Sequence, residues 1–276
     1  MSYYEKTFSD LKLKTQSFEG QTCLWVGLNR PEARNALSLD MIESLVQVLE
    51  QGDQDPEIKV MVIYGEGECF SAGGDVKDME SREGMFAGDS NELRLNYVHG
   101  IQKIPRAIEN LNTPLLAMIN GPAIGAGADL ASMCDLRVGF YNSKFGVTFS
   151  KLSLVSGDGG LFFLPRIVGY AKALEMSLTG DIYNGEECFK MGLLNTYAEK
   201  KEDLLPKTEK LINKILSNGP VSQSMIKRAL KHSTKGDLNS CLDLMAAYQG
   251  IVQRTDDHFE SLKAFREKRR PIFKGK

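Results

Sequence analysis

The chain has 276 residues, which is more than one ordinary domain and less than two. Its 34 lysines and arginines against 36 aspartates and glutamates give a formal net charge of −2, which argues against a nucleic-acid binder. Five dispersed cysteines form no CxxC pair and only three histidines occur, so neither a disulfide framework nor a multi-histidine metal site is favoured. We expect a reducing, cytoplasmic compartment, because no apolar signal segment opens the sequence.

Four short apolar runs rich in branched side chains predict strands. They lie at residues 22–28, 58–64, 114–119 and 135–140. The last three are apolar almost throughout, as strands covered on both faces are. Helical patterns separate these runs, so we expect crossover connections and a largely parallel sheet.

Helical periodicity dominates after about residue 160. The expected helices cover 37–51, which Ser38 would cap, and then 91–110, 161–179, 185–191, 204–217, 221–231, 238–253 and 257–267. We therefore predict an α/β core over residues 1–200 and a helical C-terminal segment over residues 201–276. The apolar stripes of that segment need partners, which either the core or another subunit would supply.

Residues 114–134 are nearly uncharged and about long enough to cross a membrane. Glycines and prolines interrupt this stretch, however, and Asp129 lies within it. A buried strand, a glycine turn and a buried helix explain the pattern better, so we expect no membrane association.

Glycine clusters follow predicted strands at 65–75, 121–129 and 157–160. Such glycines let backbone N–H groups approach a ligand closely. A dinucleotide site is not supported, because the GxGxxG-like pattern that starts at Gly125 has Leu130 in place of its third glycine and lacks the acid that should follow. Neither a P-loop nor a GxSxG hydrolase motif occurs.

Two of the glycine loops lie near a carboxylate in the sequence. Gly73 and Gly74 end one loop, and residues 125–127 open a helix after another strand. Two N–H groups from such loops can form an oxyanion hole, and Asp129 follows Ala126 by about one helical turn. The alternative is structural, with glycines that let a helix approach the sheet and Asp129 as a cap or a buried pair. The spacing leaves both interpretations open.

Several motifs occur together in a characteristic order. They are residues 29–37 (NRPEARNAL), 69–77 (CFSAGGDVK), 119–130 (INGPAIGAGADL), 134–135 (CD) and 178–181 (LTGD). In this combination the sequence resembles the enoyl-CoA hydratase/isomerase (crotonase) superfamily, from about residue 10 to the end of the chain. No single motif would identify the family, but the ordered set does.

The resemblance implies a spiral of ββα units, a helical C-terminal segment that makes trimer contacts, and homotrimers or homohexamers. It implies acyl-CoA thioesters as substrates, with no metal and no cofactor apart from the CoA of the substrate itself. The thioester oxygen would lie between the amides of Gly74 and Ala126. Lys268 matches a position near the CoA 3′-phosphate, with plain solubility as the alternative. Residues that match the CoA-binding loops are Ala33, Arg34, Ala72, Gly73 and Val76.

The two catalytic glutamates of the family's hydratases fall on Asp129 and Phe149. Asp129 keeps a carboxylate, whereas Phe149 cannot ionise and would make the pocket drier. Asp158 is a second acid, one residue beyond the position of an aspartate in the family's dienoyl-CoA isomerases. We assign Asp158 as the catalytic partner of Asp129, and the alternative is a helix N-cap, a position that aspartate favours.

The resemblance and the acids together predict an enoyl-CoA hydratase that works through a thioester enolate, with Asp129 and Asp158 in general acid–base roles. Double-bond isomerisation of an enoyl- or dienoyl-CoA is the alternative, which the apolar Phe149 favours. A non-catalytic acyl-CoA-binding protein is a further alternative. The residues expected to line the acyl pocket are Met79, Met85, Tyr97, Phe149 and Phe162.

Overall fold

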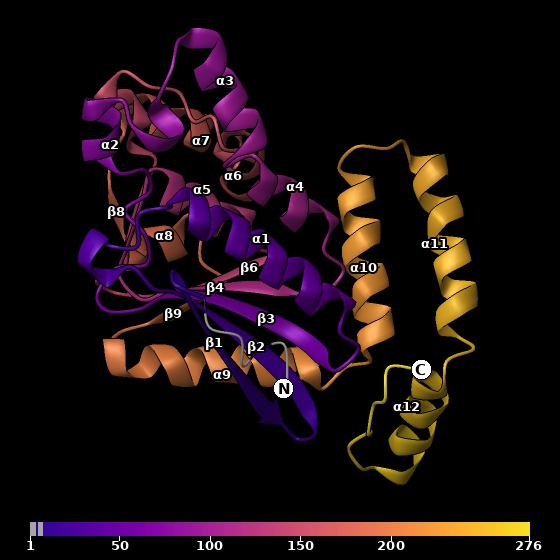
Figure 1. Ribbon diagram of the computed structural model, residues 1–276. Coiled ribbons are helices and arrows are strands. Elements are labelled where there is room, and N and C mark those ends of the chain that lie inside the picture. Colours follow the sequence, from indigo (N-terminus) through magenta and orange to yellow (C-terminus); the bar gives the residue numbers. More distant parts are fainter. Residues whose placement is uncertain (1–3, 5–7) are drawn as a thin grey trace.

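The computed structural model describes residue 4 and residues 8–276 (Figure 1). Its centre is a six-stranded sheet in the order β1-β2-β3-β4-β6-β9, in which β1 is antiparallel to β2 and all other neighbours are parallel. The strands are β1 (Leu11–Phe18), β2 (Gln21–Leu28), β3 (Ile58–Gly65), β4 (Leu115–Ile119), β6 (Leu136–Phe140) and β9 (Thr196–Ala198). The four strands expected from the apolar runs are confirmed, and β1 and β9 are additional.

Both faces of the sheet are covered. On one face the alternating side chains Leu24, Val26, Met61 and Ile63 join the larger hydrophobic cluster with the helices α1 (Leu39–Gln54), α4 (Lys103–Asn110) and α5 (Ala126–Met133). On the other face Cys23, Trp25, Val60 and Val62 join a second cluster with α9 (Leu204–Leu216). Figure 1 shows these two layers of helices on either side of the strands. The core packing therefore extends to Leu216, beyond the change in composition near residue 200.

A smaller sheet carries the second glycine loop. Its strands are β5 (Pro122–Ile124), β7 (Lys144–Gly146) and β8 (Tyr183–Asn184), in the order β5-β7-β8. Residues 114–134 therefore form a strand of each sheet and then α5, as the strand–turn–helix interpretation predicted. Within the described residues, no helix is both long and apolar enough to cross a membrane.

Two of the expected helices are broken at glycines. The helix predicted over 91–110 is α3 (Ser90–His99) followed by α4, with Gly100 ending α3. The helix predicted over 161–179 is α6 (Gly160–Val168) followed by α7 (Tyr170–Thr179), with Gly169 between them at φ +79°. This backbone angle favours glycine, so the residue that separates α6 from α7 is suited to the turn. The remaining helices between residues 8 and 200 are η2 (Pro31–Ala33), α2 (Val76–Ser81), η3 (Gly84–Phe86), η4 (Thr148–Leu152) and α8 (Gly185–Lys190).

The last three helices of the chain extend away from the sheet. After η5 (Lys201–Asp203) and α9 come α10 (Pro220–Ser233), α11 (Leu238–Val252) and α12 (Asp256–Glu267). The first of the three is tied to the core by Lys227, whose Nζ lies 2.6 Å from Asp135 Oδ2 and donates to the Thr113 carbonyl at 2.8 Å. In Figure 1, α11 and α12 stand apart from the sheet, and large apolar side chains such as Leu238 and Phe265 are exposed on them.

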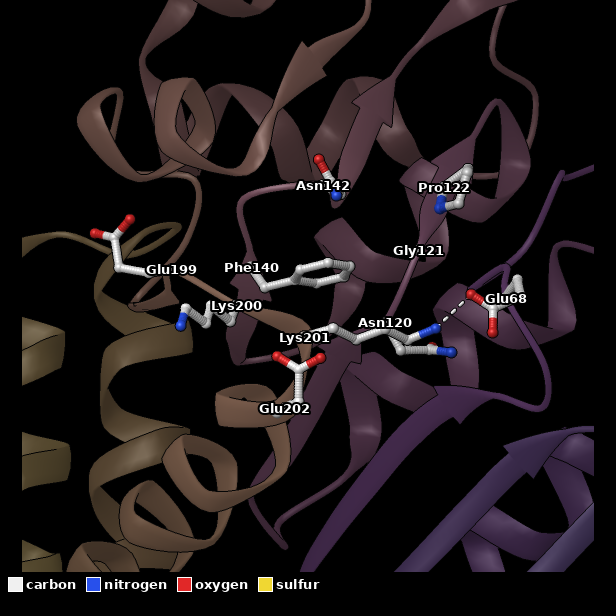
Figure 2. A pocket seen from close by; sticks show the side chains of 10 residues that line it. All are labelled: Glu68, Asn120, Gly121, Pro122, Phe140, Asn142, Glu199, Lys200, Lys201 and Glu202. Atoms are coloured by element: carbon white, nitrogen blue, oxygen red, sulfur yellow. Dashed lines mark hydrogen bonds and ion pairs between the residues drawn. The ribbon is translucent and has the colours of Figure 1, made fainter.

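Asn120, directly after β4, fixes the end of β3. Its Oδ1 accepts from the Gly65 amide at 2.9 Å, and its Nδ2 donates to the carbonyls of Gly65 at 2.7 Å and Gly67 at 3.1 Å. Asn120 and the exposed Asn142 both line a pocket of about 400 Å³ at the carboxyl ends of β4, β6 and β9 (Figure 2). None of the site residues predicted from the sequence lines this pocket.

Asn120→Asp tests this arrangement, because it replaces the donating Nδ2 with an oxygen that faces two carbonyls. We expect the free energy of unfolding to fall by about 2–4 kcal/mol, measured by urea denaturation at pH 7. The matched control is Asn142→Asp in the same pocket, with an expected change below about 0.5 kcal/mol. If both variants lost the same free energy of unfolding, the hydrogen bonds of Asn120 would contribute no more than the side-chain amide of the exposed Asn142.

Candidate active site

Asn35 joins the two loops for which CoA contacts were predicted. It is fully buried, and its Nδ2 donates to the carbonyls of Glu66 at 3.0 Å and Cys69 at 2.8 Å. The preceding residue, Arg34, accepts at its carbonyl from the Ala72 amide at 2.9 Å. These bonds hold the chain before α1 against the loop after β3. The predicted residues that they bring together are Ala33, Arg34, Ala72 and Gly73.

The loop after β3 is also in backbone contact with the start of α5. Gly73 has φ +85°, and a Cβ added to it would lie 2.7 Å from the Ala126 nitrogen and 2.6 Å from the Ile124 carbonyl oxygen. The Gly73 carbonyl accepts from the Leu37 amide at 2.8 Å. Because the two ends of a trans peptide point in opposite directions, the amide of Gly74 is directed away from Leu37.

The Ala126 amide is directed outward in a similar way. The carbonyl on the same peptide, that of Gly125, accepts from the Asp129 amide at 3.0 Å within the first turn of α5. The Ala126 N–H therefore points out of the N-terminal end of the helix. Within the described part of the chain, neither this amide nor that of Gly74 donates a hydrogen bond. Two unpaired donors in adjoining loops can bind an oxygen that gains negative charge.

Two carboxyl groups are buried behind this backbone. Asp129 is fully buried and Asp158 is 2% exposed. Ser156 Oγ lies 2.6 Å from Asp129 Oδ2 and 3.0 Å from Asp158 Oδ1, so one hydroxyl contacts both acids. A Cβ on Gly160 would lie 1.9 Å from Asp129 Oδ1, and only glycine leaves room for the carboxyl there.

Burial raises the pKa of Asp129 well above its ordinary value, and the negative charge and hydrogen bonding of Asp158 raise it further. The Ser156 hydroxyl and the Gly160 amide oppose this shift. Asp129 Oδ1 receives no hydrogen bond that meets ordinary geometry from the described residues, although the Gly160 amide is nearby. Burial and the neighbouring negative charge thus both favour the protonated form of Asp129.

Asp158 does not cap α6. The helix begins at Gly160, its N-cap is Gly159 at φ +112°, and no side chain makes a capping hydrogen bond. Asp158 lies one residue earlier and accepts from Ser156 instead. The cap interpretation is therefore wrong, because the chain turns at Gly159 and directs the carboxyl toward Asp129.

A groove of about 580 Å³ leads toward the acids. Its apolar walls come from α2, η3, α3 and η4 and are formed by Val76, Met79, Phe86, Leu93, Tyr97, Leu152 and Leu154. Burial, and then the charge of Asp158, raise the pKa of Tyr97. A Cβ on Gly157 would lie 2.8 Å from the Tyr97 ring. Tyr97 therefore lies between the groove and the acid pair.

The remaining predicted residues do not all reach this groove. Met79, Tyr97 and Val76 line it, whereas Met85 is buried in the core and Phe149 packs against the same core from a half-buried position.

Phe162 lies elsewhere, with its ring centroid 3.6 Å from the Arg166 guanidinium carbon. Lys268 ends α12, which Figure 1 shows far from α2 and α3. Lys268 therefore does not join the loops around Arg34 within this single chain, and its CoA contact stays a prediction.

Ser156 and Asn35 were not identified as important from the sequence. Ser156 lies 27 residues from Asp129, and nothing in the local pattern indicates that the loop before α6 returns to α5. Asn35 lies within a motif, and its positive φ of 54° is a conformation that asparagine tolerates. The sequence does not reveal that Asn35 is buried or that it has a positive φ, so its importance becomes visible only in the structure.

Comparisons with known proteins find similarity over nearly the whole chain. The family model described as "Enoyl-CoA hydratase/isomerase" matches residues 19–276. Crotonyl-CoA hydratase of Syntrophomonas wolfei is 34% identical over 90% of this chain and 93% of its own length. The 1,2-epoxyphenylacetyl-CoA isomerase of Escherichia coli is 31% identical, over 90% and 94%. The crystal structure of an enoyl-CoA hydratase from Bacillus anthracis has a TM-score of 0.88 at 29% identity, covering 97% of this chain and all of that one. The predicted α/β fold is thereby confirmed.

Asp129→Asn should remove a pH-dependent cost to stability. A carboxyl whose pKa is higher in the folded than in the unfolded chain makes folding less favourable as the pH rises above about 4. We therefore expect the variant to gain stability over the wild type as the pH rises above about 4, until the pH passes the raised pKa of Asp129, measured by urea denaturation. Asp243→Asn, an exposed change on α11, is the control and should follow the wild type at every pH. Parallel curves for wild type and Asp129→Asn would contradict a raised pKa.

Proposed function

The chain belongs to the enoyl-CoA hydratase/isomerase family, and we propose that it is a hydratase that adds water across the double bond of an α,β-unsaturated acyl-CoA. The observation that carries this proposal is the buried pair of Asp129 and Asp158 beside the unpaired amides of Gly74 and Ala126. The pair supplies one proton donor and one proton acceptor, and the amides supply donors for the thioester oxygen. The relatives named as hydratases support this choice.

The reaction follows from these groups. The thioester oxygen accepts hydrogen bonds from Gly74 and Ala126, and the water oxygen forms a bond to the β-carbon while the double-bond electrons move onto the thioester oxygen. Asp158 takes the proton that the water loses, and Asp129 gives its own proton to the α-carbon of the enolate. Each amide that meets the enolate oxygen contributes about 3 kcal/mol to transition-state stabilisation. The thioester itself makes the α-carbon acidic, so the scheme uses no further cofactor.

The backbone around Arg34 and Ala72 is where we place the CoA moiety. These two residues lie side by side, and Arg34 is exposed and available to a phosphate. The apolar groove that ends at Tyr97 then accommodates the acyl group. The exposed apolar side chains of α11 and α12 support assembly into the trimers or hexamers that the resemblance implies.

Double-bond isomerisation is the second candidate. Phe149 occupies the position of a hydratase glutamate, packs against the core and offers no group that could hold a water molecule. An isomerase moves a proton from one carbon to another and needs only the acid pair and the amides. The 1,2-epoxyphenylacetyl-CoA isomerase of Escherichia coli shows that relatives of this chain include isomerases of CoA thioesters, although its named substrate is an epoxide.

The two candidates are separated by incubating the enzyme with 2-enoyl- and 3-enoyl-CoA esters in D2O and weighing the products by mass spectrometry. A hydratase yields a product heavier by one heavy water. Deuterium in the acyl chain without added water identifies an isomerase and overturns the hydratase proposal. Straight, branched and cyclic acyl groups in the panel give the acyl preference at the same time.

Asp129→Asn should lower kcat by at least about 100-fold, because it removes the proton donor while keeping the shape of the side chain. Initial rates on the best substrate of the panel measure this loss, and KM should change much less. The exposed Asp243→Asn serves again as the control and should keep the wild-type rate. An Asp129→Asn enzyme of near-wild-type activity would rule out the assigned role.

A further inference from the structure

Ser156 contacts both acids, which also interact directly with each other. Its Oγ is 2.6 Å from Asp129 Oδ2 and 3.0 Å from Asp158 Oδ1. A hydroxyl carries one hydrogen and can donate only one of these two bonds. A protonated carboxyl can donate the other bond to Ser156. The geometry therefore allows a chain of two hydrogen bonds that runs in one direction, from a protonated acid through Ser156 to an ionised one.

The three groups of the cluster differ in their exposure. Asp129 is fully buried, its Oδ1 has no exposed surface, and Gly160 closes the space beside it. Asp158 is 2% exposed, whereas Ser156 is half-buried and is the most exposed of the three groups.

The titratable groups around the acid pair bear on where its proton resides. The titratable group that acts on Asp129 is Asp158, and Tyr97 of α3 faces Asp158. No lysine, arginine or histidine among the described residues contributes to the pKa shift of Asp129. No cation of the described residues therefore compensates a second negative charge beside Asp129, which favours a shared proton.

We propose that Ser156 is a positioning residue that passes the shared proton between Asp129 and Asp158. This inference rests on the proposed function and adds a residue to it. In the transfer, the O–H bond of one carboxyl breaks as its proton moves to Ser156 Oγ, and the Ser156 O–H bond breaks as its own proton moves to the other carboxylate. Ser156 ends as a neutral hydroxyl, and only the negative charge has changed place.

The transfer restores the enzyme after each turnover. When Asp158 has taken a proton from water and Asp129 has given one to the α-carbon, the proton is on Asp158 and the charge is on Asp129. The return through Ser156 regenerates the starting state without exchange with solvent. An isomerase that takes a proton from one carbon and returns another to the next carbon needs the same return.

Three variants test the proposal kinetically. Ser156→Ala should lower kcat by about 10- to 100-fold with KM within about twofold, because the return step loses its path while binding is unchanged. The Ser156 hydroxyl opposes the raised pKa of Asp129, so its loss should move the basic limb of the pH–rate profile to higher pH. Ser156→Thr keeps the hydroxyl and should restore both properties.

The matched control is Ser132→Ala, which removes a buried hydroxyl of α5 that donates only to the Ala128 carbonyl. It should keep the wild-type rate and pH profile. A Ser156→Ala enzyme with the wild-type kcat and an unmoved basic limb overturns the proposal, and shows direct transfer between the carboxyls. A loss that Ser132→Ala matches and Ser156→Thr does not repair also overturns it, as a structural effect.

A second measurement does not depend on turnover. The infrared C=O stretch of a protonated carboxylic acid, assigned by its loss in Asp129→Asn, should be present in the wild type at neutral pH. In Ser156→Ala this band should persist to higher pH, and an unchanged titration midpoint overturns the proposal. A wild type that converts no enoyl-CoA would contradict the proposed function alone, since the band still decides the role of Ser156.

Discussion

Close contact between backbone segments is the constraint on which the whole site depends. A Cβ on Gly127 would lie 2.2 Å from the Ser71 carbonyl oxygen, one on Gly73 would meet the Ala126 nitrogen, and one on Gly160 would overlap Asp129. At each point a missing side chain lets one loop or helix end rest directly on another. The two amides, the two acids and the CoA-facing loops are brought together by these contacts. Hydrogen bonds of Asn35 then hold the loops in register.

Much of the fold follows from hydropathy, because strands buried on both faces are apolar at every position. The strands β3 and β4 show this clearly, with side chains in both hydrophobic clusters. The strand β1 escaped prediction since it lies at the sheet edge, where lysine and threonine alternate with a few apolar residues. The breaks at Gly100 and Gly169 were also missed, because a single glycine inside a helical pattern is often tolerated.

The candidate site, like the fold, could be predicted only in part from the sequence. Asp129 and Asp158 could be selected by residue type and by resemblance, and the structure places both within reach of one hydroxyl. The shared hydroxyl itself, and the glycine that makes room for Asp129, depend on a return of the chain over 27 residues that no local pattern reveals. The position of Lys268, far from the loops around Arg34, depends on how α12 is placed, which the sequence of that helix does not specify.

The asparagine that ends β4 has a consequence for the chemical ageing of the protein. Asn120 is followed by Gly121, and in an Asn–Gly sequence the glycine nitrogen readily attacks the side-chain carbonyl carbon, which releases ammonia and forms a cyclic imide that water then opens to an acid. In the folded chain three hydrogen bonds hold that amide to the end of β3 and prevent it from rotating toward the backbone. Heating removes this protection, and the resulting aspartate lacks the donor that the fold requires. Thermal denaturation should therefore become irreversible with time spent unfolded. The rate at which the fold opens around Asn120 then limits how long the protein stays native.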